Sequence, residues 1–111
     1  MPAYITFFGT SVPEHTIEQS SIVEFMVRAS QLDSNEARKL RVLYRSTKIQ
    51  KRHSVLKDYG LTENFEFYTN TPDLEPFPTV SQRMLAYRHY ALPLALKSLQ
   101  SIQNLEKLNN V

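Results

Sequence analysis

Apolar residues run together at the start of the chain, where β-branched and aromatic side chains occupy consecutive positions. Residues 3–8 read Ala-Tyr-Ile-Thr-Phe-Phe, and the run stops at Gly9 and Thr10. A short continuous apolar run that ends at a turn is typical of a strand buried on both faces. We therefore expect a strand over residues 3–8. A second apolar run at residues 65–68 is short and fits a strand and a loop equally.

Helical periodicity follows in three segments. Ser21 and Glu24 have the spacing of a capping box, and apolar residues then recur at helical spacing, which predicts a helix over residues 21–31. A second helix is expected over residues 34–46. A third is expected over residues 79–109, with a kink near Pro93, because a proline inside a helix removes a backbone hydrogen bond.

The Pro-rich stretch at residues 70–78 separates these helices, and it predicts a fixed loop because each proline restricts the residue before it. The expected class is α/β, mostly helical with one convincing strand. Such a strand needs hydrogen-bonding neighbours along its edges. We therefore expect either that the strand pairs with another chain or that the 111 residues are part of a larger fold.

Charge is distributed unevenly along the sequence. The net charge is only +2, but residues 38–57 contain eight basic residues and no acidic one. At about 100° per residue along the helix expected at 34–46 and just beyond it, four of them fall on one stripe beside an apolar arc: Arg38, Arg41, Arg45 and Lys48. A concentrated basic segment in an otherwise acidic chain points to an anionic partner.

Composition excludes several kinds of chemistry. The chain has no cysteine, so it has no thiol nucleophile, disulfide or Cys-ligated metal. Its two glycines are too few for a Gly-rich nucleotide-binding loop. The three histidines, His15, His53 and His89, are too far apart in sequence to predict a metal site. We expect no targeting signal, no membrane span and a cytoplasmic location.

Three blocks of sequence together resemble the N-terminal part of bacterial type III polyketide synthases, the chalcone and stilbene synthase-like family. The first is Ile5–Pro13, followed by Gln19 and Ser20. The second is Ala37–His53, a basic helix that ends in an Ile-x-x-Arg turn. The third is Pro76–Tyr87, which continues through Ala91–Ala95. The blocks span most of the chain, and they are specific only jointly.

The resemblance implies a thiolase-like fold of layered helices and sheets, for which residues 1–111 would form a partial N-terminal domain, and a homodimer. It also implies a decarboxylative Claisen condensation of malonyl-CoA onto an acyl-CoA starter. The Cys, His and Asn that perform this reaction in the family lie C-terminal to the matched region. No catalytic residue is therefore assigned here, and these residues alone are expected to be inactive.

The resemblance also implies that this segment contributes to the entrance of the coenzyme A tunnel, where the family uses basic residues of the second helix to hold phosphates. Lys39 matches one such lysine position, and Ser46 matches a position that is basic in plant members. Arg41 and Arg45 lie beside matched positions. The expected phosphate-binding residues are thus Lys39 and Arg45, followed by Arg41 and Ser46. Acyl-CoA and malonyl-CoA would be substrates, and no permanently bound cofactor or metal is expected.

Two other classes of function remain open at this point. A basic helix also neutralises nucleic-acid phosphates, although the acidic remainder of the chain and the lack of a binding motif argue against a nucleic-acid partner. The other class is an assembly module, which self-associates through the strand at 3–8 or packs its long helix on a partner.

Overall fold

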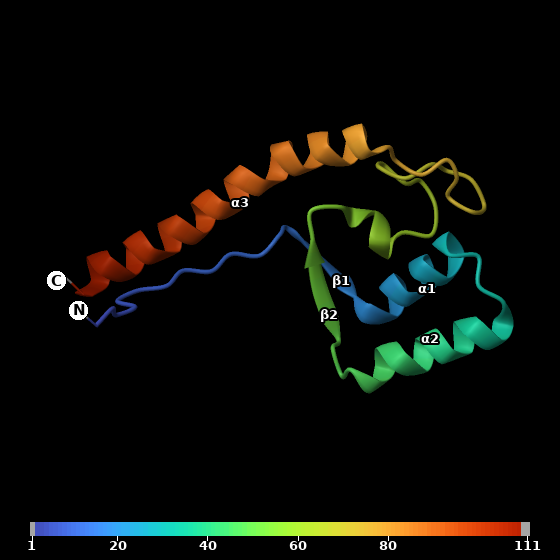
Figure 1. Cartoon of the computed structure of the whole chain (residues 1–111), viewed down its shortest axis with the longest axis horizontal. Helices are drawn as coiled ribbons and strands as arrows, with labels where there is room; N and C mark the ends of the chain where they lie inside the picture. Colours follow the sequence, from blue (N-terminus) through green and yellow to red (C-terminus); the bar gives the residue numbers. More distant parts are fainter. Residues whose placement is uncertain (1, 110–111) are drawn as a thin grey trace. The chain divides into compact units, whose positions relative to one another are not determined.

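The computed structural model describes residues 2–109 and shows a mixed α/β chain, with three α-helices and one two-stranded antiparallel sheet (Figure 1). The expected α/β class is confirmed at this level. The elements in chain order are β1 (His15–Glu18), α1 (Gln19–Ala29), α2 (Ser34–Ser46), β2 (Lys51–Ser54), the 3-10 helix η1 (Lys57–Gly60) and α3 (Val80–Asn109). The chain divides into two compact units. One is Pro13–Val80, and the other combines the N-terminal segment up to Val12 with the helix from Ser81 onward.

The sheet of the first unit was not predicted from the sequence. β1 and β2 pair antiparallel, with His15 opposite Ser54 and Glu18 opposite Lys51. Only one of these eight residues, Ile17, is buried. Its side chain lies close to Gly60, where an added Cβ would come within 3.2 Å of Ile17 Cγ2. Short polar strands of this kind carry almost no hydrophobic signal.

Helices α1 and α2 are consecutive and in contact, and they differ in how they begin (Figure 1). α1 begins at Gln19, two residues before the expected capping box, and its N-cap residue Glu18 makes no side-chain capping bond. The expected capping box is wrong because Ser21 and Glu24 both lie inside the helix. α2 has the bounds expected from the sequence, and Asp33 caps it by accepting a hydrogen bond from the Glu36 amide at 2.8 Å.

The core of this unit is aromatic. Phe25 on α1 is 4% exposed and packs edge-on against the rings of Tyr59, Phe65 and Tyr68, with centroids 5.0, 5.9 and 5.0 Å away. Leu74, which is fully buried, completes the central cluster. These contacts fix the loop of residues 61–79 on α1, and residues 65–68 belong to that loop and not to a strand.

Two charged side chains hold this loop, which has no regular hydrogen bonding of its own. Asp58 is 1% exposed, and its carboxylate accepts hydrogen bonds from the amides of Glu66, Phe67 and Tyr68 at 3.1, 2.8 and 2.7 Å. The Arg28 guanidinium donates to three loop carbonyls, those of Thr62, Thr71 and Pro72, at 2.7, 2.8 and 2.8 Å. Both residues satisfy backbone groups that would otherwise lack partners, so their role is structural.

In the second unit, the N-terminal segment follows α3. Ser11 Oγ donates to the Leu94 carbonyl oxygen at 2.7 Å. Gly9 approaches the helix so closely that an added Cβ would collide with the Ser98 carbonyl oxygen and the Ile102 side chain. Glycine is therefore required at position 9. α3 begins at Val80, one residue after the expected start, and continues through Pro93; the kink stays a prediction.

The strand expected at residues 3–8 is wrong. The segment has no strand assignment, and within the part of the chain that the structure describes its backbone makes no backbone hydrogen bond. Its neighbour is a helix, whose own backbone groups are already paired and cannot complete a sheet. Its side chains are also not buried, since Tyr4, Ile5 and Phe8 are 83%, 89% and 75% exposed.

Candidate functional site

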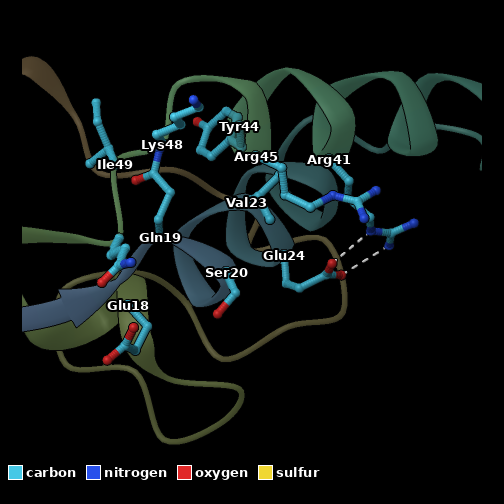
Figure 2. Close-up of a pocket in the computed structure, with 11 residues that line it drawn as sticks. Glu18, Gln19, Ser20, Val23, Glu24, Arg41, Tyr44, Arg45, Lys48 and Ile49 are labelled. Carbon is cyan, nitrogen blue, oxygen red and sulfur yellow. Dashed lines mark hydrogen bonds and ion pairs between the residues drawn. The ribbon is translucent and has the colours of Figure 1, made fainter.

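A groove of about 780 Å³ opens between the start of α1 and the C-terminal half of α2 (Figure 2). Its position follows from the chain path, because α2 ends in a turn that returns beside the first turn of α1. The backbone N–H of Gln19 fixes this junction by donating a hydrogen bond to the backbone carbonyl oxygen of Gln50 at 2.8 Å. The walls combine apolar Val23 and Ile49 with three basic side chains.

The basic side chains reach the groove because of their spacing. Arg41, Arg45 and Lys48 are four and three residues apart, which places them on one face of α2 and its C-terminal turn. The chain leaves the helix at Thr47, and Lys48 then adopts a left-handed conformation with a φ of 59°. Helices often end with a left-handed residue just past the C-cap, and this conformation is more costly for a residue with a Cβ than for glycine.

The three cations are not equivalent, because one is already paired. Arg41 Nε lies 2.7 Å from Glu24 Oε1, and Arg41 Nη2 lies 3.0 Å from Glu24 Oε2. This two-point contact lowers the pKa of the Glu24 carboxyl below its usual value and raises that of Arg41. Both side chains are partly exposed, at 41% for Arg41 and 55% for Glu24, so water screens the pair.

Arg45 and Lys48 are the cations that remain available. Across residues 2–102, for which side chains are described, neither side chain has an ion pair or a hydrogen bond. The other carboxylate that lines the groove, that of Glu18, lies 3.8 Å from Lys51 Nζ on the neighbouring strand. The groove thus presents two unpaired positive charges to a ligand, and their natural complement is an anion.

The residues expected from the sequence separate into two groups. Arg45 and Arg41 line the groove, whereas Lys39 and Ser46 do not. Lys39 is exposed on another face of α2, consistent with the 100° turn per residue of a helix. Ser46 directs its hydroxyl to the Leu43 carbonyl oxygen at 2.7 Å, so its donor is used within the helix.

Two groove residues were missed by sequence reasoning. Lys48 lies on the predicted basic stripe, and its spacing from Arg45 could have placed it in the site. Gln19 is 6% exposed, and its Oε1 atom is buried without a hydrogen-bond partner among the described residues. The Gln19–Ser20 pair was part of the first sequence block, but nothing in the sequence indicates an unsatisfied carboxamide.

Among the side chains described, those of residues 2–102, no three His, Asp or Glu are grouped so as to hold a metal ion. No helix within residues 2–109 has the length and apolarity needed to cross a membrane. Compared with known proteins, the chain matches no family model, no curated protein and no solved structure.

Proposed function

We propose that this chain is the N-terminal part of a type III polyketide synthase-like acyltransferase and that the groove between α1 and α2 binds the phosphates of coenzyme A thioesters. The single observation that carries the binding site is the pair of cations, Arg45 and Lys48, that line one groove and make no ion pair with any described residue. The family assignment is supported by the three sequence blocks, one of which contains most of this groove.

The chemistry available in the groove is recognition and not catalysis. Charge-assisted hydrogen bonds from a guanidinium and an ammonium are suited to phosphate oxygens, and the guanidinium can make two of them. The chain has no cysteine that could be activated as a thiolate to accept an acyl group. Its contribution to a decarboxylative condensation would be to hold acyl-CoA and malonyl-CoA by the nucleotide end.

The revised set of phosphate-binding residues follows from the geometry of the groove. Arg45 and Lys48 make the primary contacts, and Arg41 joins them when it leaves Glu24. Lys39 and Ser46, which the family resemblance suggests, do not line this groove and have no role in the proposal. The proposal also includes a thiolase-like layered fold and a cytoplasmic location, both of which rest on the sequence alone.

Isothermal titration with coenzyme A and with dephospho-coenzyme A tests this function. The two ligands differ only in the 3′-phosphate, so tighter binding of coenzyme A would support phosphate recognition at the groove. Equal affinities, or no binding of either ligand, would contradict it. Displacement of coenzyme A by single-stranded DNA of arbitrary sequence, with a steep dependence on salt, would instead favour a nucleic-acid partner.

A second candidate function, self-association, is favoured by a different observation. Tyr4, Ile5 and Phe8 are mostly exposed in a segment that makes no backbone hydrogen bond to any residue the structure describes, and such a segment is a template for pairing with another copy. Sedimentation of the wild type and of an Ile5→Lys variant tests this. A dimer that the substitution weakens supports it, and a monomer at all concentrations contradicts it.

A further inference from the structure

The groove contains one polar group whose role phosphate binding does not explain. Gln19, the first residue of α1, is 6% exposed, and its Oε1 atom has no hydrogen-bond partner among the described residues. A buried polar atom without a partner is destabilising, and most buried polar atoms in native proteins are paired. The unpaired oxygen of this carboxamide therefore needs an explanation.

The surroundings of this carboxamide suggest what it binds. In Figure 2 the Gln19 side chain extends from the start of α1 toward the end of α2, where Tyr44 and Lys48 also line the groove. A carboxamide has one acceptor and one donor side by side, which match the amino group and N7 of adenine. Tyr44 adds an aromatic ring to the same groove, and aromatic rings stack on bases of any sequence.

We propose that Gln19 recognises the base of an adenine nucleotide whose phosphates are held by Arg45 and Lys48. This inference rests on the proposed function, because it assigns the nucleotide end of coenzyme A to one site. The Oε1 atom accepts a hydrogen bond from the 6-amino group of the base. In the ligand-free chain Oε1 is buried, so the carboxamide must turn toward the groove to contact the base. This rotation breaks no hydrogen bond at Oε1, because that atom has no partner among the described residues.

The polar groups and the size of the groove fit a nucleotide better than a small anion. Inorganic phosphate would use Arg45 and Lys48 and leave Gln19 unsatisfied. A nucleotide uses the cations and the carboxamide together, and a groove of about 780 Å³ is large enough for a base and a ribose as well as phosphate.

The test compares adenosine 3′,5′-bisphosphate with inosine 3′,5′-bisphosphate, which replaces the 6-amino donor by a carbonyl acceptor. We expect the wild type to bind the adenosine ligand about tenfold more tightly, since a two-point carboxamide contact to adenine discriminates against a base that lacks the 6-amino group. Gln19→Met keeps the length of the side chain and removes both polar atoms, and it should reduce the preference to nearly none while phosphate-dependent binding remains.

The possible failures separate the two proposals. Equal affinity of the wild type for both bisphosphates, or a preference for inosine, would overturn the role of Gln19 and leave phosphate binding intact. Absence of binding by either bisphosphate would overturn the proposed function and this inference with it. The comparison uses the wild-type chain, so it stands even if Gln19→Met does not fold. Tighter binding of ADP than of the 3′,5′-bisphosphate would assign the groove to free nucleotides and overturn the coenzyme A assignment, whereas the adenosine–inosine comparison alone decides the role of Gln19.

Discussion

The Glu24 carboxylate on α1 holds the Arg41 guanidinium on α2 through two contacts, at 2.7 and 3.0 Å. The pair ties the two helices together at the edge of the groove, and it neutralises one of the three cations there. A ligand phosphate that needs Arg41 must compete with this carboxylate. The pair therefore sets how much positive charge the groove offers.

Replacing Glu24 should consequently strengthen ligand binding. In Glu24→Gln the side chain keeps its size but loses its charge, so Arg41 becomes available to phosphate. We expect the affinity for coenzyme A to rise about three- to tenfold, as measured by titration calorimetry at neutral pH. Glu63→Gln, which removes an exposed carboxylate outside the groove, is the matched control and should change the affinity little. An unchanged affinity in Glu24→Gln would show that Arg41 does not take part.

The same pair predicts a pH dependence of stability. The pKa of Glu24 is lowered in the folded chain, chiefly by its hydrogen bond from Arg41. Its stabilising contribution is therefore present above the carboxyl's ordinary pKa of 4.5 and is lost as the pH falls through the lowered value. Carboxyl NMR titration should find a Glu24 pKa below the ordinary value in the wild type and close to it in Arg41→Ala. The contribution is small because both groups are partly exposed.

Substitution of Lys48 should affect stability and binding in opposite directions. Its φ of 59° is costly for a residue with a Cβ and free for glycine. Lys48→Gly should raise the free energy of unfolding by about 0.5–1 kcal/mol, because it removes this cost. The same change removes a groove cation and should weaken coenzyme A binding several-fold.

Thr47→Gly is the control for Lys48→Gly. Thr47 has a helical φ of −69°, so glycine there gains no conformational relief and should destabilise the chain. If Lys48→Gly bound coenzyme A as tightly as the wild type, Lys48 would not be a phosphate contact.

Asp58 should be among the residues most sensitive to substitution, although it has no part in binding. Its buried carboxylate accepts three amide hydrogen bonds, and in Asp58→Asn one of the two oxygens becomes a donor facing amide donors. We expect a loss of about 2–4 kcal/mol in the free energy of unfolding. Urea unfolding followed by tyrosine fluorescence reports it, because Tyr59 and Tyr68 pack against the core beside this loop. A loss below about 0.5 kcal/mol would contradict the structural role.

The two helix starts can be compared directly by mutation. Asp33→Ala removes an observed capping bond and should cost about 1 kcal/mol. Ser21→Ala removes the hydroxyl of a capping box that the sequence suggests but the structure does not form, and it should cost less than about 0.5 kcal/mol. The same urea unfolding measurement serves both variants, and the reverse order would favour the sequence-based start of α1.

The sequence predicts the helices better than the strands, for a physical reason. Helix α2 could be predicted because its acidic first turn, its apolar arc and its basic stripe are all local in sequence. The pairing of His15–Glu18 with Lys51–Ser54 is nonlocal, and polar side chains on both strands leave no alternation to detect. Residues 3–8 have the composition of a strand, but a strand also needs a partner, which composition cannot supply.

The candidate site shows the same division between local and nonlocal information. The basic stripe and Arg45 are local features of one helix, and both could be identified from spacing. The pairing of Arg41 with Glu24 joins residues 17 positions apart, so the sequence counted Arg41 as available when it is not. The buried state of Gln19 depends on how the end of α2 returns to α1, and only the structure shows it.

The measurement that tests the central claim most directly is the affinity for coenzyme A of an Arg45→Ala, Lys48→Ala double variant. The matched control is an Arg38→Ala, Arg52→Ala double variant, since it also removes two positive charges from the basic segment but none from the groove. The account predicts at least a tenfold loss for the groove variant, near-wild-type affinity for the control, and near-wild-type affinity for Lys39→Ala. Equal losses in both double variants, or a loss only in Lys39→Ala, would contradict the assignment of the groove as the phosphate site.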